Sequence, residues 1–259
     1  FTGDAAFSGR AEEYERVESL FARMEEVLSE GYDGEMVTLV VPGNHDLNTP
    51  DEIADDEAAR LQGKPGWDVL QQIAVDQQAR MKDYNAWALK RDCAFDGAQV
   101  VSREVRIGDG DNRKSFRVSL INTVPVSNRR ATTDKQFHYI DESSIGQIAC
   151  EKDCDLHIAL GHHSPEWFAD PVMRQLSEAL RSYADILLLG HEHVAGSYER
   201  IDGDKSILVL PGGQCDFAPG GPFTFSSICL DMDEYPYEAA ISIHEWKVQS
   251  QRFCEKERH

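Results

Sequence analysis

The stretch "LVVPGNHDLNTP", residues 39–50, decides the fold. The apolar run at 36–41 is rich in β-branched residues and is typical of a buried strand, and it ends abruptly at Pro42-Gly43-Asn44-His45-Asp46. An amide, an imidazole and a carboxylate therefore follow one another where the strand runs out. Taken alone, Asn-His-Asp is equally compatible with a turn that an Asx hydrogen bond closes.

Composition limits the classes of protein that fit. The chain has 259 residues, 41% of them hydrophobic and 28% charged, which is enough for one large domain or two small ones. No apolar run is long enough to span a bilayer and no signal peptide is visible, so no membrane contact is expected. The formal net charge of −20 argues against a broad electrostatic grip on nucleic acid, but bound divalent cations reverse the field locally and leave a nucleotide substrate open. Six cysteines without a CxxC pair indicate a reducing, cytoplasmic environment.

Helical and strand-like segments alternate along the chain, which predicts an α/β fold of packed layers. A single domain is expected over residues 1–259, with a mostly helical insert at about 51–92 and a polar surface loop at 125–140. Further helices are predicted at 11–30, 142–151 and 171–183, and strands at 98–107, 115–121, 156–161, 185–190, 206–212, 224–231 and 239–248.

Chemistry-bearing residues follow several of these strands. Gly161-His162-His163 comes after one strand, Gly190-His191-Glu192-His193 after another, and Thr2-Gly3-Asp4 resembles the stub of a third. Loops beyond the carboxyl ends of strands converge on one crevice in α/β sheets. Each motif alone has a plain structural explanation, but their joint occurrence at strand ends favours a metal site. Oxygen and imidazole donors without thiolate suit Mn, Fe, Zn, Ni or Co.

The motifs "GD…SG", "GNHD", a strand ending in His-His, and "GHEH", in this order, resemble those of the calcineurin-like metallophosphoesterases. The resemblance runs from Gly3 to about residue 213. It implies a layered αββα sandwich of two mixed β-sheets flanked by helices. It also implies two divalent metal ions, with Mn favoured.

The same resemblance assigns roles to individual residues. Asp4 bridges both ions, while the first ion is held by Asn44, His162 and His191 and the second in part by His193. His45 is not a ligand in this scheme. It lies beside the site as the proton donor to the leaving oxygen, and a neighbouring carboxylate such as Asp46 orients it.

Two features depart from the family pattern. An Asp-x-His motif on an earlier strand normally completes the second metal site, and Asp155-Leu156-His157 cannot replace it because it starts its strand about 17 Å from the crevice. Because the chain starts at Phe1 rather than Met, the missing strand and motif are expected upstream. In "HHSPEW", the strand end favours His162 as the ligand, whereas alignment on Ser164-Pro165 favours His163.

The predicted function is phosphoester hydrolysis. "GDAAFSG" and "GNHD" are closer to the bacterial phosphodiesterase-like branch than to protein phosphatases, which favours a nucleotide or nucleic-acid diester as substrate. Arg129 and Arg130 either clamp a second phosphate or are solvated loop charges. A phosphomonoesterase or protein phosphatase is the second interpretation, and a catalytically silent binding or scaffold module is the third. The resemblance also allows an effector role within a larger bacterial protein, with a fused or partner domain upstream or downstream.

Overall fold

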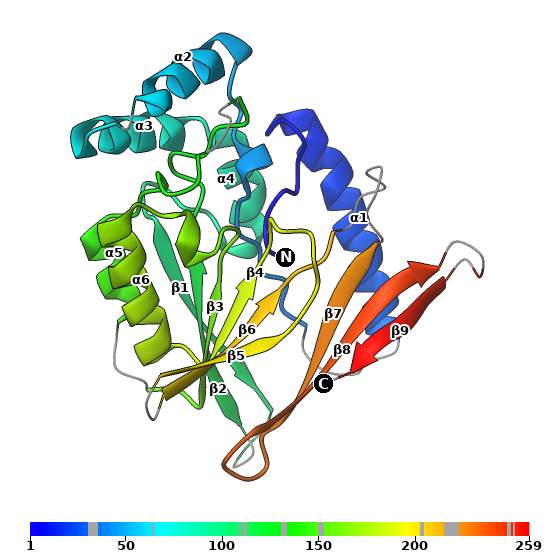
Figure 1. The fold of residues 1–259 in the computed structure, drawn as a ribbon. Helices are drawn as coiled ribbons and strands as arrows, with labels where there is room; N and C mark the ends of the chain where they lie inside the picture. Colours follow the sequence, from blue (N-terminus) through cyan, green and yellow to red (C-terminus); the bar gives the residue numbers. More distant parts are fainter. Residues whose placement is uncertain are drawn as a thin grey trace.

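A mixed six-stranded sheet forms the centre of the computed structural model (Figure 1). The structure describes residues 1–30, 36–63, 65–108, 110, 113–130, 134–149, 153–202, 205–214, 223–247, 250 and 252–258. In spatial order the strands are β1 (Val100–Ile107), β2 (Lys114–Ile121), β3 (Leu156–Leu160), β4 (Ile186–Leu189), β6 (Lys205–Pro211) and β5 (Tyr198–Asp202). The four inner strands are parallel and the two outer ones antiparallel to their neighbours, so the inner carboxyl ends meet at one edge.

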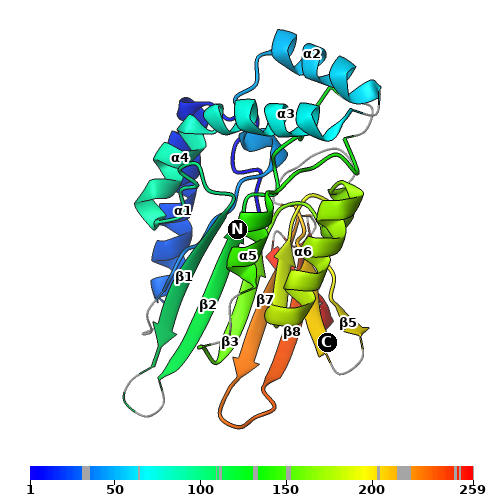
Figure 2. The same cartoon turned by 90° about the vertical axis from the view of Figure 1, so that its left-hand side faces the viewer.

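Both faces of this sheet are covered, as the near-continuous apolar sequences of its inner strands require. Helices α5 (Glu142–Ile148) and α6 (Asp170–Tyr183) pack on one face, where Ala159 and Leu187 point (Figure 2). A second, antiparallel sheet packs on the other face, against the alternate residue Leu188. Its strands are β7 (Thr224–Asp231), β8 (Glu238–Lys247) and β9 (Arg252–Arg258). The predicted layered α/β architecture is confirmed.

Helices α1 (Ala11–Glu30) and α4 (Lys82–Ala88) cover the β1–β2 side of the same face as the second sheet. An aromatic cluster joins them: the Trp87 ring stacks on Tyr14 at 5.3 Å between centroids and meets Phe21 edge-on at 5.6 Å. These contacts between large buried rings hold α1 against α4, and so help to position the loop before α1, which carries Asp4. None of the described helices is both long and apolar enough to cross a membrane.

The segment 125–140 corrects a sequence prediction in part. It is an irregular loop as predicted, and Arg129, Arg130, Lys135 and Gln136 are exposed, but residues 125–128 are buried beside α2 (Asp51–Gln62) and α3 (Trp67–Ala79), and His138 and Ile140 are buried as well. Gln77 of α3 explains how a polar segment can be buried, because its side chain accepts from the Val126 nitrogen at 2.7 Å and donates to the Ser127 carbonyl at 2.9 Å. The helices predicted within 51–92 are present and stand over the edge where the inner strands end (Figure 1).

Other corrections concern strands. Residues 36–41 are extended and Val40 and Val41 are fully buried, but they form no strand. The backbone hydrogen bonds of this segment to other described residues join Leu39 and Val41 to Phe1. The charged segment 252–258 is strand β9, which pairs with β8 and escaped prediction. Strand β5 also escaped prediction because its sequence, "YERID", lacks an apolar alternation.

Candidate metal centre and active site

Four of the five predicted metal ligands come together at the carboxyl edge of the central sheet. His162 follows β3, His191 follows β4, Asn44 begins the short 3-10 turn Asn44–Asp46, and Asp4 lies on the segment that pairs with residues 39–41. These four residues form what we call the donor cluster.

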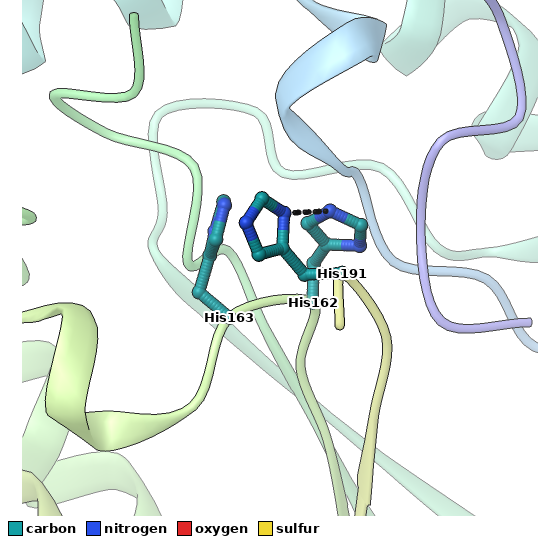
Figure 3. Close-up of side chains that lie close together, drawn as sticks. All are labelled: His162, His163 and His191. Carbon is teal, nitrogen blue, oxygen red and sulfur yellow. Dashed lines mark hydrogen bonds between the residues drawn. The ribbon is translucent and has the colours of Figure 1, made fainter. Parts of the chain in front are cut away.

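Distances within the donor cluster are short. His162 Nε2 lies 3.3 Å from Asp4 Oδ2 and 3.0 Å from Asn44 Oδ1. His191 Nδ1 lies 3.1 Å from the same Asn44 oxygen and 3.2 Å from His162 Nε2 (Figure 3). Side chains from four separate parts of the chain thus direct their ligand atoms at one another.

The donor set fits a metal ion. The Nδ1–H of His162 donates to the Thr2 carbonyl at 2.7 Å, which leaves the Nε2 lone pair directed at the Asp4 and Asn44 oxygens. Lone pairs that face one another repel unless a cation or a proton lies between them. Bonds of about 2.0–2.1 Å to one ion place neighbouring donors about 2.9–3.4 Å apart. The observed separations of 3.0 to 3.3 Å fall within that range.

The pKa shifts within the donor cluster also fit a site for a cation. Burial alone would raise the pKa of Asp4, but the hydrogen bond and charge of His162 lower it to about 2. Burial would lower the pKa of His162, but Asp4 raises it. Burial, and then the charge of His162, lowers the pKa of His191 to about 4. Asp4 and His162 therefore each stabilise the charged form of the other, and a bound cation would satisfy the same negative charge on Asp4.

The next two residues of the GNHD turn have different surroundings. The half-buried His45 has its ring Nδ1 2.9 Å from the Phe7 carbonyl, and its backbone nitrogen donates to Asp4 Oδ1 at 2.9 Å. Asp46 was expected to orient His45, and this is wrong. Its buried carboxylate accepts instead from the backbone nitrogens of Gly43 and Ala6, at 2.8 and 2.9 Å, and from the Tyr14 hydroxyl at 2.9 Å.

Asp46 is therefore a positioning residue whose contribution the sequence did not reveal. It ties the turn that carries Asn44 to the loop that carries Asp4, so the two oxygen donors stay in register. Burial, opposed by these hydrogen bonds, raises the pKa of Asp46 to about 6. Asp46 therefore accepts hydrogen bonds from backbone nitrogens and does not contact the imidazole of His45.

His193 and His163 stand apart from the donor cluster. His193 is exposed, and no contact with the cluster joins it within the described part of the chain. His163 is buried behind His162, with its Nδ1 3.1 Å from the Thr123 carbonyl and its ring 4.2 Å from that of His138. One ring nitrogen each of His162, His163 and His191 lies within 4.8 Å of the others, but it is His162 that meets the Asp4 and Asn44 oxygens.

Several residues at the carboxyl edge of the central sheet have a strained backbone conformation. Asp4, His191 and His193 all have left-handed φ values, of 55°, 64° and 56°. Non-glycine residues adopt this region only when their surroundings enforce it, and such residues cluster at functional sites. Gly43 is required for packing, since a Cβ there would lie 2.1 Å from Asp4 Oδ1.

Two further contacts complete the rim of the site. The Trp167 ring meets the His191 ring edge-on, with 4.4 Å between centroids, and the Trp167 Nε1 donates to Glu192 at 3.1 Å. Trp167 thus forms one side of the site, and no sequence motif predicted this. Arg129 and Arg130 both pair with Asp51, at 2.9 and 3.0 Å. Their charges are therefore partly neutralised at the N-terminus of α2 rather than directed at the donor cluster.

The family model "Calcineurin-like phosphoesterase" matches residues 1–195. A search of curated proteins gave no match. Similar solved structures include Vps29 from Entamoeba histolytica complexed with Zn²⁺, at 16% identity and a TM-score of 0.26, with 61% of this chain and 59% of that one covered.

Two other similar structures are more remote in sequence. GAP50 of Plasmodium, described as the anchor in the inner membrane complex, is 14% identical with a TM-score of 0.31 and 58% and 47% coverage of this chain and that one. Vps29 from Cryptosporidium parvum is 12% identical with a TM-score of 0.30 and 92% and 75% coverage. The chain spans less than two thirds of the length of the first two of these proteins.

The family model covers residues 1–195 and so includes every residue of the donor cluster. The chain belongs to the calcineurin-like phosphoesterase family. Members of this family typically bind two divalent metal ions.

Proposed function

We propose that the protein is a metal-dependent phosphodiesterase that acts on a nucleotide or nucleic-acid substrate. The observation that carries this proposal is the donor cluster, in which two imidazoles, an amide and a carboxylate converge beside His45. Asp4, Asn44, His162 and His191 would hold one divalent ion. His193 is exposed and lies apart from them, and it would contribute only to a second ion. Manganese suits this mixed nitrogen and oxygen set.

The divalent ions, when bound, neutralise the phosphoryl oxygens and acidify the water that attacks phosphorus. The chain's own residues do the rest. As the new P–O bond forms and the bond to the leaving oxygen breaks, the His45 imidazolium gives its Nε2 proton to that oxygen. The Phe7 carbonyl accepts from Nδ1–H and so keeps Nε2 as the nitrogen that faces the reaction.

An open groove beside His45 leaves room for a large substituent on phosphorus. It has a volume of about 580 Å³ and is lined by Phe7, whose ring centroid lies 5.5 Å from that of His45. The groove would take one of the two substituents of a diester. The preference for a diester over a monoester rests on the motifs "GDAAFSG" and "GNHD", which resemble those of the phosphodiesterase-like branch.

Hydrolysis of bis(p-nitrophenyl) phosphate and of p-nitrophenyl phosphate, each with Mn²⁺ and with chelator, tests the proposal. We expect Mn²⁺-dependent cleavage of the diester in preference to the monoester. Cleavage of the monoester alone would contradict the diesterase assignment and indicate a phosphomonoesterase. No cleavage of either compound, with metal bound, would indicate a non-catalytic module.

A further inference from the structure

The groove lies on the leaving-group side of the proposed reaction. His45 is the proton donor to the leaving oxygen in the function proposed above, and Phe7 contacts its ring. Phe7 is 75% exposed, so its aromatic face is open to a bound molecule. From Phe7 the groove extends toward the N-terminal ends of α1 and α2. A leaving group released at His45 would occupy it.

The walls of the groove concentrate positive charge in a chain whose formal net charge is −20. Arg10, Arg129 and Arg130 line it together with only two carboxylates, Glu13 and Asp51. Asp51 is engaged by Arg129 and Arg130. Arg130 also lies 3.7 Å from Asp55, so the charges of Arg129 and Arg130 are balanced by carboxylates at the N-terminal end of α2. Arg10 is therefore the groove arginine that matters most for anion binding.

Glu13 does not neutralise Arg10 by direct pairing. Its carboxylate accepts from the backbone nitrogens of Ser8 and Arg10, at 3.0 and 3.1 Å, and from the Ser8 hydroxyl at 3.0 Å. The Arg10 side chain is exposed, and no carboxylate of the described residues forms an ion pair with it. Its guanidinium is thus available for bidentate contact with a phosphate group.

We propose that the groove binds a leaving group that carries a second phosphate, with Phe7 against its nucleobase or sugar and Arg10 on the phosphate. This inference rests on the proposed function and narrows its substrate class. A linear dinucleotide or oligonucleotide with a phosphate beyond the scissile bond fits the groove. A cyclic mononucleotide does not, because its leaving oxygen stays within one ring and carries no second phosphate.

Steady-state kinetics on two linear dinucleotides test the proposal. The pair differs only in a terminal phosphate on the leaving nucleoside, and the reactions contain Mn²⁺. We expect the phosphorylated dinucleotide to have a kcat/KM about tenfold higher through a lower KM, as a charge-assisted contact provides. Arg10→Gln is expected to abolish this preference, and Arg10→Lys to restore part of it.

Arg16→Gln is the matched control, because Arg16 is an exposed arginine on α1, six positions after Arg10, that does not line the groove. It should leave the preference intact. Equal rates for both dinucleotides in the wild type, or equal losses on both in Arg10→Gln, would overturn the proposal while leaving phosphodiesterase activity standing. If no diester is cleaved at all, the proposed function fails and this inference fails with it.

Discussion

Two groups of histidines lie side by side at the end of the central sheet and differ in what faces their ring nitrogens. In the donor cluster, His162 and His191 face the oxygens of Asp4 and Asn44. Behind the donor cluster lie His138 and His163, which we call the buried pair. Their ring centroids are 4.2 Å apart. Their Nδ1 atoms both lie against the Thr123 carbonyl, at 2.8 and 3.1 Å.

The difference teaches that several side-chain donors converging on one point, 3.0 to 3.3 Å from one another, mark the candidate metal site better than the number of histidines does. His162 and His163 are neighbours in sequence, yet their environments shift their pKa values in opposite directions. Asp4 raises the pKa of His162 against the effect of burial, whereas burial and the charge of His138 lower that of His163 well below its usual value. The first histidine can exchange its proton for a metal ion, and the second is kept neutral in the core.

Removal of the Asp4 carboxylate should have the largest effect. We expect Asp4→Ala to lose bound Mn²⁺, with an affinity more than about 100-fold weaker, and to lose turnover to background. Metal content by elemental analysis and diester hydrolysis are the two measurements. The matched variant is Asp134→Asn, because Asp134 lies 3.4 Å from the buried pair's His138. It should keep both metal and turnover.

His45 separates proton donation from metal binding. We expect His45→Ala to lower kcat by about 10²- to 10⁴-fold with Mn²⁺ affinity unchanged, because its ring is a proton donor and not a ligand. Calorimetric Mn²⁺ titration and diester kinetics report the two quantities separately. Loss of bound metal in this variant would show that His45 belongs to the donor cluster.

Asp46 should affect stability as well as rate. Asp46→Ala leaves buried donors of Gly43, Ala6 and Tyr14 without an acceptor, so we expect a loss of about 3 kcal/mol or more in the free energy of unfolding. Urea denaturation measures it. Asp56→Ala, at an exposed position on α2, should change stability by less than about 0.5 kcal/mol. A similarly small change in Asp46→Ala would contradict its positioning role.

The smallest effect is a pH dependence that distinguishes the two adjacent histidines in chelator-treated protein. His163 stays neutral when folded but gains a proton when unfolded below its ordinary pKa of 6.5, so it makes stability fall as the pH drops below that value. His163→Leu should remove up to about 1.4 kcal/mol per pH unit of this slope. His162 has a raised pKa and contributes stability below pH 6.5 that is lost as the pH rises through its folded pKa. His162→Leu should therefore change the slope in the opposite direction, and equal changes would contradict the contrast.

Strand ends were the part of the molecule that the sequence predicted well. Apolar runs followed by glycine and polar ligands located His162 and His191, because β-branched runs and glycine turns report local preference and burial together. The same argument predicted that His193 is a ligand, because it also follows β4, but the turn after β4 leaves His193 exposed. A spacing of two residues does not determine which way a side chain leaves a strained turn.

Tertiary context explains the failures. Residues 125–140 carry a loop-like composition, but Gln77, 49 positions away from Val126, satisfies their backbone and allows residues 125–128 to be buried. Five of the seven residues of strand β9 are charged, and only pairing with β8 makes it a strand. The role of Asp46 depends on Tyr14, 32 positions earlier in the chain. None of these partnerships leaves a periodic signal in one sequence.

Anomalous diffraction from crystals soaked in Mn²⁺ tests most directly whether the donor cluster is the metal site. The account predicts an anomalous peak about 2.0–2.3 Å from ligand atoms of Asp4, Asn44, His162 and His191. A peak between His138 and His163, or no peak near Asp4 at saturating Mn²⁺, would contradict it.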